Sequence, residues 1–298
     1  MNQKKRILFI INPISGIRRR QKQRLPELIV QYLDRTKYTF AIRYTEYAGH
    51  ATELAREAVH NGVDVVVAVG GDGSVNEIGQ CLVHTNTALA ILPFGSGNGL
   101  ARHLGIPLNA LQALQVINQG KVKNIDVGEF APGKYFFSNV GVGFAVTVVK
   151  WFEHHKVRGF LSYVVAVVRA FTNSQPLRLK LAVDEKIMDK EVTLLNVCNS
   201  NQYGYNVGLA PDARLDDGLL DVVVLNKFSR WRFPWYAICI LLKKTAWVPH
   251  YELYLVKDCR VLNEDKQYWT LQVDGELEKF RYDWEVKVLQ GALRVMVP

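Results

Sequence analysis

The most informative segment of the chain is Val65-Val66-Val67-Ala68-Val69-Gly70-Gly71-Asp72-Gly73-Ser74-Val75-Asn76-Glu77-Ile78-Gly79-Gln80. The apolar run before Gly70 is typical of a strand buried on both faces of a parallel sheet. The glycines that follow allow a sharp turn and a close approach of the backbone to a ligand. We expect Ser74 to cap the next helix with Glu77 as its capping-box partner, so that the helix N-terminus faces the loop. The pattern predicts strand, loop and helix, with room for a phosphate group.

A glycine turn that only closes a strand–helix unit explains the glycines equally well. Asp72 favours the phosphate interpretation, because a carboxylate beside a phosphate is suited to hold Mg²⁺ or to accept a substrate proton.

Length and composition indicate an ordinary folded protein of about two domains. The chain has 298 residues, of which 49% are hydrophobic and 22% charged. Its four cysteines are scattered and include no CxxC pair. This argues against a disulfide framework or a zinc site and favours a reducing compartment. The N-terminus is charged and then apolar, but its apolar run of five residues is short for a signal peptide, so we expect a first strand in a cytoplasmic protein.

The positive charge is concentrated at the N-terminus. The first 24 residues contain eight basic residues and no acidic one, against a net charge of +9 for the whole chain. Such a cluster can attract nucleotide phosphates, anionic headgroups or nucleic acid, or can form a solvated helix face. We expect no nucleic-acid partner, because no nucleic-acid-binding motif accompanies the cluster.

Strands and helices alternate in the first part of the chain. We expect strands at 7–11, 38–45, 65–69 and 88–92 and helices at 18–33, 50–60 and 109–118, with short helices after the glycine loops. This alternation predicts a parallel, doubly wound α/β sheet, which binds ligands at the carboxyl ends of its strands. Glycine-containing loops at 12–16, 70–74 and 95–99 all fall at those ends. Neither a Walker-A motif nor a correctly spaced GxGxxG is present, which argues against an ordinary P-loop enzyme or dehydrogenase.

After about residue 126 the pattern changes to period two, which predicts a mainly antiparallel β-sandwich. We expect strands at 122–130, 135–140, 177–183, 192–199, 220–225, 269–273 and 278–282, with one helical stretch at 160–171. The expected domains are 1–126, completed by 290–298, and 127–289.

Residues 233–242 form a short apolar stretch flanked by basic residues and tryptophans. The stretch is about half the length of a membrane-spanning helix. Its composition fits an interfacial segment that touches a bilayer, and equally a helix packed in the core.

Two acid-rich turns stand out in the second half. Residues 210–221 contain four Asp residues, and Asp274 and Glu276 flank Gly275. Each can be a simple hairpin turn. The density of acids in the first suggests a hard-cation site, and a carboxylate of the second can deprotonate an attacking hydroxyl group.

Together these motifs resemble the diacylglycerol kinase catalytic-domain family, which includes bacterial lipid kinases and sphingosine and ceramide kinases. The resemblance covers nearly the whole chain and rests on these segments: Asn12-Pro-Ile-Ser-Gly16, Thr45 with Gly49-His-Ala51, Gly70-Gly-Asp-Gly-Ser-Val-Asn-Glu77, Leu92-Pro-Phe-Gly-Ser-Gly-Asn98, Asp126, Leu209-Ala-Pro-Asp212, Asp217-Gly-Leu-Leu-Asp221 and Asp274-Gly-Glu276. It implies a nucleotide-binding α/β domain, a C-terminal β-sandwich, and ATP and Mg²⁺ as cofactors.

The resemblance also implies roles for individual residues. The residues that would contact ATP are Asn12, Ser15, Gly16, Thr45, Gly70, Gly71, Gly73, Ser74, Asn76, Glu77, Ser96 and Asn98. Asp72 and Asp126 would organise the catalytic Mg²⁺, and either Glu276 or Asp274 would be the proton acceptor. A structural Mg²⁺ would lie near Arg214, Asp216, Asp217 and Leu219.

One position departs from the bacterial diacylglycerol kinase pattern. Those enzymes usually carry an acid after the asparagine of the second loop, whereas Gly99 follows Asn98 here. The Gly-Ser-Gly-Asn version is similar to sphingosine and ceramide kinases. It is compatible with a long-chain base as substrate, or with weaker metal binding.

We therefore expect a cytoplasmic lipid kinase peripheral to the inner face of a membrane, acting on diacylglycerol or a sphingoid base. A homodimer is one expected assembly. The alternatives are a soluble NAD kinase-type enzyme and a non-catalytic nucleotide- and lipid-binding regulator.

Overall fold

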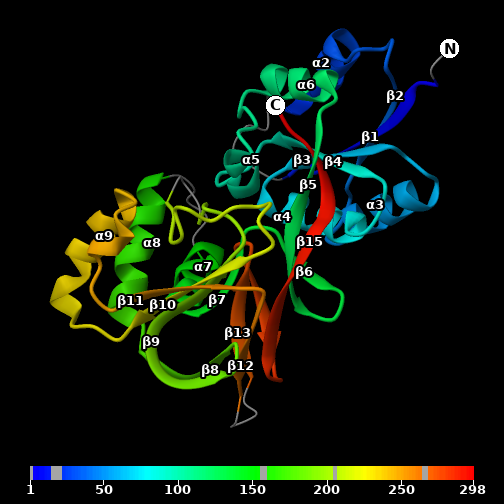
Figure 1. Ribbon diagram of the computed structural model, residues 1–298. Coiled ribbons are helices and arrows are strands. Elements are labelled where there is room, and N and C mark those ends of the chain that lie inside the picture. The colour runs from blue at the N-terminus through cyan, green and yellow to red at the C-terminus, as the bar shows by residue number, and fades with distance from the viewer. Residues whose placement is uncertain (1–2, 15–21, 155–159, 204–206, 264–267) are drawn as a thin grey trace. The chain divides into compact units, whose positions relative to one another are not determined.

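The computed structural model describes residues 3–14, 22–154, 160–203, 207–263 and 268–298. The chain divides into two compact units, residues 1–125 with 291–298 and residues 126–290 (Figure 1). Two strands, β5 (Val122–Ala131) and β15 (Trp284–Met296), contribute residues to both units.

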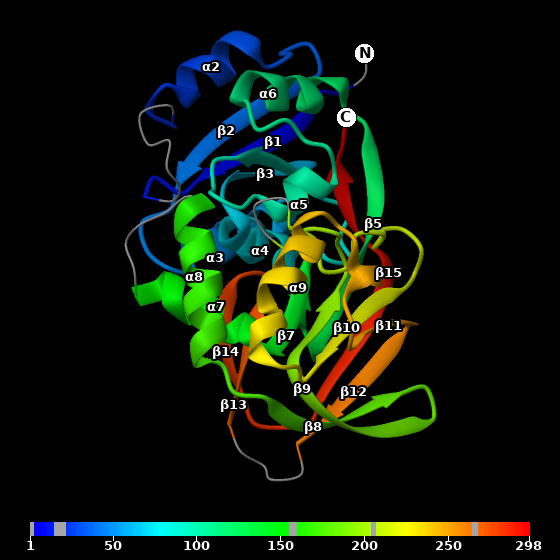
Figure 2. The same ribbon diagram turned by 90° about the vertical axis from the view of Figure 1, so that its left-hand side faces the viewer.

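The first unit is a parallel sheet in the strand order β15-β4-β3-β1-β2. Its elements are β1 (Lys5–Ile11), α2 (Leu25–Tyr32), β2 (Tyr38–Tyr44), α3 (His50–His60), β3 (Val65–Gly70), α4 (Asp72–Leu82), β4 (Ala88–Pro93), α5 (Gly99–His103) and α6 (Ala110–Gln119). Helices α2 and α6 cover one face of the sheet and α3 and α4 the other (Figures 1 and 2). All residues of β3 and β4 are buried, because both faces are covered. The predicted parallel doubly wound sheet is confirmed.

The last strand joins this sheet at its end. Val295 of β15 pairs in parallel with Leu89 of β4, and the His84 N–H donates to the Ala292 carbonyl oxygen. The C-terminal residues therefore extend the sheet that the first residues of the chain begin.

The second unit is built mainly from antiparallel strands. Its elements are β6 (Lys134–Phe136), β7 (Asn139–Gly143), α7 (Phe144–His154), α8 (Phe160–Asn173), β8 (Leu177–Val183), β9 (Lys186–Cys198), β10 (Leu220–Asn226), the 3₁₀ turns η1 (Arg230–Arg232) and η2 (Thr245–Trp247), α9 (Phe233–Leu241), β11 (Tyr251–Val256), β12 (Asp258–Leu262), β13 (Trp269–Val273) and β14 (Glu276–Phe280). The strand order is β14-β13-β7-β9-β8-β12-β15, with β10 pairing β9 and β11. The predicted β-sandwich is confirmed.

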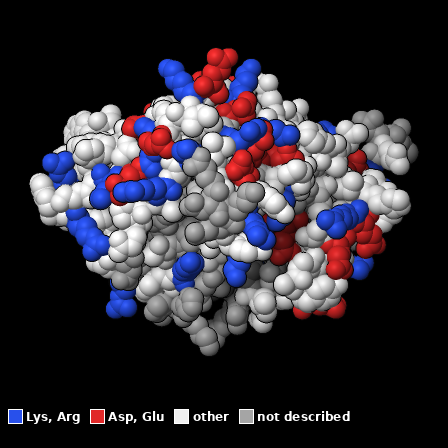
Figure 3. Space-filling view, turned by 90° about the horizontal axis from the view of Figure 1, so that it is seen from below, with Lys and Arg blue, Asp and Glu red and all other residues white. Residues whose placement is uncertain are grey.

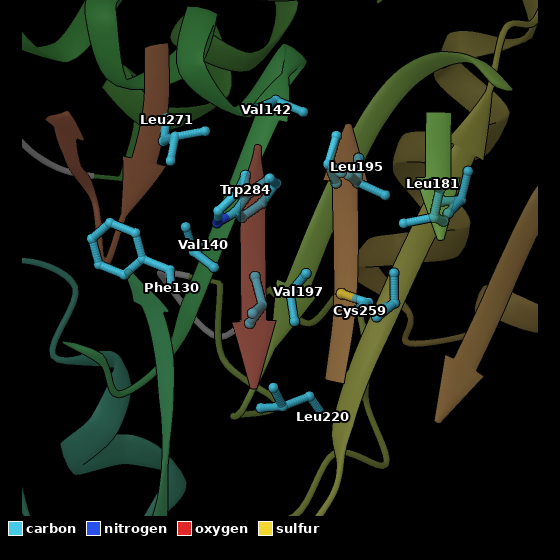
Figure 4. Packing of buried hydrophobic residues seen from close by; sticks show 14 of the residues in the cluster. Phe130, Val140, Val142, Leu181, Leu195, Val197, Leu220, Cys259, Leu271 and Trp284 are labelled. Carbon is cyan, nitrogen blue, oxygen red and sulfur yellow. The ribbon is translucent and has the colours of Figure 1, made fainter. Parts of the chain in front are cut away.

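Alternating residues of the central strands face two separate apolar clusters. In β10, Val222 and Val224 join the cluster that contains Trp284, whereas Val223 and Leu225 join a cluster with Tyr236 of α9. Figure 4 shows the first cluster, in which Val140, Val197 and Trp284 come from different strands. Because both faces are covered, β10 is apolar at nearly every position.

One expectation for this unit was wrong, and three elements were missed. The single strand expected over 135–140 is divided into β6 and β7, because the N–H groups between them bond to the side chain of Asp274. Helix α7 was missed, since its run of β-branched residues at 146–149 is typical of a strand. Strands β11 and β12 were also missed.

Candidate active site

In the first unit, two glycine loops touch through their backbones. The loop after β3 contains Gly71 and the loop after β4 contains Gly95. The Phe94 and Gly95 N–H groups donate to the Gly70 carbonyl oxygen, at 2.8 and 3.1 Å. A Cβ atom added at Gly95 would lie 2.4 Å from the Gly71 Cα atom. Only glycine fits at position 95, and at Gly71 an added Cβ atom would lie 3.1 Å from the Gly95 Cα atom, so both positions favour glycine because of this close approach.

Asp72 joins the two loops through its side chain. It is the first residue of α4, where a carboxylate is favoured by the helix dipole. Its Oδ1 atom accepts a hydrogen bond of 2.7 Å from the Gly99 N–H. A Cβ atom at Gly97 would lie 2.8 Å from its Oδ2 atom. The carboxylate is thus fixed in place at the carboxyl end of the sheet.

The predicted cap of α4 was wrong. Helix α4 begins at Asp72 with Gly71 as its N-cap residue, and no side chain makes the capping bond. Ser74 lies buried within the first turn, and the Glu77 carboxylate instead accepts a hydrogen bond from the Gly49 N–H. Burial raises the pKa of Glu77. The glycine turn lets the helix begin three residues earlier than the capping-box pattern predicts, with Gly71 in place of Ser74 as the N-cap residue.

Asn98 shapes the second loop from within. Its backbone is left-handed, with φ of 52°. Its side-chain Oδ1 accepts from the Gly95 N–H at 2.9 Å, and its Nδ2 donates to the Gly95 carbonyl oxygen at 2.8 Å. Arg102 Nε donates to the Gly97 carbonyl oxygen at 2.9 Å. The Asn98 amide therefore holds the loop in shape, and Ser96, half-buried, lies at the centre of that loop.

The end of β1 adds a cation that the sequence interpretation did not single out. The Lys22 ammonium donates to the Asn12 carbonyl oxygen at 2.7 Å and lies 5.6 Å from the centre of the Phe94 ring. Lys22 is 4% exposed, which is uncommon for lysine. The only sequence signal was its membership of the basic N-terminal cluster. Ser15 and Gly16 lie outside the described residues.

The remaining predicted nucleotide contacts occupy the neighbouring loop and helix. The Thr45 N–H donates to the Ile11 carbonyl oxygen at 2.9 Å, which places Thr45 at the end of the β1–β2 pair. Asn76 accepts a 3.1 Å bond from Gln80 Nε2 within α4. Gly70 is the last residue of β3, and Gly73 and Ser74 lie in the first turn of α4.

In the second unit, Asp126 is an anchor for the acid-rich loop. Asp126 is 1% exposed, and its Oδ2 atom accepts a 2.7 Å bond from the Gly218 N–H. Its own N–H donates to the Leu215 carbonyl oxygen at 2.7 Å. The Asn199 side chain donates to its carbonyl oxygen at 2.8 Å. Asp126 therefore fixes residues 215–218, the segment predicted to hold a structural Mg²⁺.

Within that loop two bonds link the predicted metal residues to one another. Arg214 Nε lies 3.2 Å from Asp216 Oδ1, and Asp217 Oδ1 accepts from the Leu219 N–H at 3.1 Å. Burial raises the pKa of Asp221 to about 7, helped by the charges of Asp217 and Asp212. Among the described residues no group of three or more His, Cys, Asp or Glu side chains is arranged to hold a metal. A cation here would have to use backbone carbonyl oxygens and water as well, which Mg²⁺ accepts.

The β13–β14 turn distinguishes its two acids. Asp274 Oδ2 accepts from the Phe137 N–H at 2.8 Å, and its Oδ1 accepts from the Ser138 and Asn139 N–H groups at 2.8 and 3.0 Å. Asp274 thus holds the chain between β6 and β7. Glu276 is exposed at the start of β14.

The second unit also contains an apolar cavity of about 140 Å³ beneath α8 and α9. Its walls include an aromatic cluster in which the Phe171 and Phe233 rings stack at 3.8 Å. Tyr236 lines the cavity and is 1% exposed, and its hydroxyl group has no hydrogen-bond partner among the described residues. Cavities of similar size and lining stay dry and take up small apolar molecules.

Comparison with known proteins identifies the class to which this fold and site belong. The diacylglycerol kinase catalytic domain matches residues 6–130, and the YegS C-terminal NAD kinase β-sandwich-like domain matches residues 138–297. The chain belongs to the diacylglycerol kinase catalytic-domain family, a family of kinases.

Individual relatives agree with this assignment. The chain is 29% identical to a diacylglycerol kinase of Bacillus subtilis (strain 168) over 278 residues, covering 91% of this chain and 90% of the relative. It is 29% identical over 229 residues to a diacylglycerol kinase of Staphylococcus aureus (strain MRSA252), covering 75% and 71% of the two chains. The crystal structure of a diacylglycerol kinase from Bacillus anthracis str. Sterne shares the fold, with a TM-score of 0.80 and 24% identity over 100% of this chain and 99% of that one. No helix within the described residues is long and apolar enough to cross a bilayer.

Proposed function

We propose that this protein is an ATP-dependent lipid kinase, which transfers the γ-phosphoryl group of ATP to a lipid hydroxyl group. The observation that carries the proposal is the pair of glycine loops held in backbone contact, with Asp72 fixed between them at the start of α4. A helix N-terminus beside a glycine loop is suited to bind phosphate.

The ATP site follows from the shape of these loops. Cβ atoms at Gly95 and Gly97 would collide with the Gly71 Cα atom and the Asp72 carboxylate, so these glycines let the two loops pack together beside the N-terminus of α4, where a phosphate is favoured. We assign the triphosphate to this cradle, with the Lys22 ammonium partly neutralising its charge. Asn12, Thr45 and Ser96 would contact the rest of the nucleotide.

In the first unit Asp72 would hold Mg²⁺, because carboxylate oxygens are the ligands that this cation prefers. The family resemblance assigns the same role to Asp126 of the second unit. When bound, Mg²⁺ neutralises charge on the transferred phosphoryl group. Each of the two carboxylates already accepts a backbone N–H through one oxygen. These bonds fix the orientation of both side chains before the ligand arrives.

Glu276 is the proposed general base. In the transfer, the lipid hydroxyl oxygen forms a bond to the γ-phosphorus, the bond from that phosphorus to the β–γ bridging oxygen breaks, and ADP leaves. The hydroxyl proton passes to the Glu276 carboxylate. Asp274 is a positioning residue in this scheme, because both its oxygens accept backbone N–H groups.

A lipid acceptor is supported by the apolar cavity and by the names of the relatives. The cavity encloses about 140 Å³, less than the roughly 300–1,000 Å³ typical of complete ligand pockets. It would therefore take only the end of an acyl chain. Diacylglycerol is the acceptor named for the relatives, and Gly99 keeps a sphingoid base as the second candidate.

The test is phosphorylation with radiolabelled ATP and Mg²⁺ in mixed micelles of diacylglycerol, sphingosine, ceramide or undecaprenol, with NAD as a soluble acceptor. Label on one lipid supports the proposal and names the acceptor. Label on NAD alone supports the NAD kinase-type alternative, which the C-terminal domain match motivates. ATP binding without any labelled product supports the non-catalytic regulator, which Gly99 motivates.

Asp72→Asn should abolish turnover while the protein remains folded, because it removes the charge that holds Mg²⁺. Asp184→Asn is the matched control. Asp184 is exposed in the turn between β8 and β9 with φ of 52°, and asparagine tolerates that conformation. An Asp72→Asn protein that keeps the wild-type rate would refute the role of Asp72.

A further inference from the structure

Helix α9 is apolar on all sides, yet only part of it is buried. Phe233, Tyr236 and Ile240 line the cavity beneath it. On its other side Trp235 and Ile238 are 50% and 49% exposed. A helix that is hydrophobic all round is normally buried completely. The outer side of α9 therefore lacks the apolar surroundings that its sequence suits.

The turns on either side of α9 extend this exposed surface. Trp231 of η1 is 75% exposed and Trp247 of η2 is 59% exposed. Trp235 Nε1 donates to the Trp247 carbonyl oxygen at 3.4 Å, which joins α9 to η2, and η1 continues directly into α9. We call this exposed surface the tryptophan face, formed by Trp231, Trp235, Ile238, Leu242 and Trp247.

Basic residues border the tryptophan face. No acidic residue occurs between Asp221 and Glu252, a segment that contains Arg230, Arg232, Lys243 and Lys244. Among the described residues none of these four cations forms an ion pair. Instead, Arg232 lies 5.2 Å from the Trp231 ring and Lys244 5.9 Å from the Trp247 ring. The surface therefore lacks anionic partners.

The charge is local. Figure 3 shows basic and acidic groups interspersed over the face in view, whereas its left-hand end, the side on which α9 lies in Figure 1, is mostly uncharged with several basic groups. Attraction to an anionic surface would thus act at this end of the second unit.

We propose that the tryptophan face docks on the surface of an anionic lipid bilayer. Tryptophans beside lysine and arginine are the composition of segments that lie at a membrane interface. A protein partner fits less well, because lysine is depleted in protein interfaces. The biological purpose of docking rests on the proposed lipid kinase function. The physical argument for docking rests only on the composition and exposure of the tryptophan face.

The position of the apolar cavity links docking of the tryptophan face to the proposed phosphorylation of a lipid. Three residues line the cavity and are also exposed at the surface: Val164 and Val168 of α8, and Leu241 of α9. Helices α8 and α9 lie side by side in Figures 1 and 2. The cavity therefore reaches the surface beside the tryptophan face. A lipid tail leaving a docked bilayer could enter the cavity without crossing water.

The experiment is flotation of the full-length protein with vesicles of phosphatidylcholine containing about a third phosphatidylglycerol, at low salt. Two variants test the face, Trp231→Ala/Trp235→Ala and Lys243→Gln/Lys244→Gln. Each basic residue near an anionic surface is worth about fivefold in partitioning, so the lysine pair should cost roughly 25-fold. The tryptophan pair should cost at least about tenfold. Matched controls are Tyr282→Ala and Lys186→Gln/Lys257→Gln, all exposed elsewhere in the second unit.

Wild-type binding that needs phosphatidylglycerol, is lost in both test variants and is kept in the controls supports the proposal. Vesicle binding that is equal in all the variants overturns the docking proposal. A change from dimer to monomer in the test variants, without loss of vesicle binding, also overturns it and would make the face a protein interface. Phosphorylation of a short-chain diacylglycerol in solution separates the two proposals. Test variants that keep this activity but lose vesicle binding support docking, whereas a wild-type protein that binds vesicles and phosphorylates nothing refutes only the kinase function.

Discussion

The two acids of the β13–β14 turn should have separable roles, which Asp274→Asn and Glu276→Gln can test. Three backbone N–H groups donate to the Asp274 carboxylate. Asparagine keeps one acceptor oxygen, so the Phe137 N–H would face an NH₂ group, and the other two bonds would lose their charge assistance. A lost charged bond and an unsatisfied donor cost roughly 3 kcal/mol together. Melting of the second unit should therefore fall by about 6–12 °C.

Glu276→Gln should leave melting unchanged, because the side chain is exposed. It should lower kcat by roughly 10²–10⁴-fold, the usual contribution of a general base. Glu278→Gln is the control on the same strand. Its ion pair with Lys134 is 2.7 Å long and lies at the surface, so its loss costs at most about 1 kcal/mol.

The assays are thermal unfolding followed by circular dichroism and kcat with the lipid identified in the micelle experiment. Wild-type melting of Asp274→Asn would refute the positioning role. A folded but inactive Asp274→Asn together with an active Glu276→Gln would reverse the assignment of the base.

Three further predictions concern the loops, the acid-rich segment and the cavity. Gly95→Ala should abolish ATP binding, measured by calorimetry, because its Cβ atom would lie 2.4 Å from the Gly71 Cα atom. Gly105→Ala is the control and should bind ATP normally. Its backbone is strained by a φ of 70°, but no atom lies within 4 Å of the added Cβ atom. In urea unfolding without divalent cations, Asp221→Asn should stabilise the protein at pH 8 and have little effect below pH 4. The reason is that the pKa of Asp221 is raised from 3.8 to about 7 on folding, so the stability of the wild-type protein falls as pH rises through that range. An equal effect of the substitution at both pH values would contradict this. Tyr236→Phe should raise the unfolding free energy by about 1 kcal/mol, because it removes a buried hydroxyl group that has no partner; a destabilised variant would show that the hydroxyl group is bonded in solution.

Much of the fold could be predicted from local patterns. The run Val65–Val69 reads as a doubly covered strand, because its side chains are apolar on both faces. Asn109 caps α6 and Gly120 ends it in the left-handed conformation, as their residue types favour. Helix α7 could not be predicted, because β-branched residues prefer strands and only packing against β7 and β13 overrides that preference.

Residue type and spacing were enough to predict the order of strands and helices, the glycine loops at the carboxyl ends of the strands and the set of candidate acids. The hydrogen-bond partners of each acid became known only from the folded chain. Asp72 accepts the Gly99 N–H, Asp126 the Gly218 N–H, and Asp274 three N–H groups from residues more than 130 positions away. The tertiary structure likewise placed Lys22 beside Asn12 and left Trp235 exposed while Tyr236 is buried. Hydrogen-bond partners and burial arise from contacts between segments distant in the chain, and no local pattern encodes them.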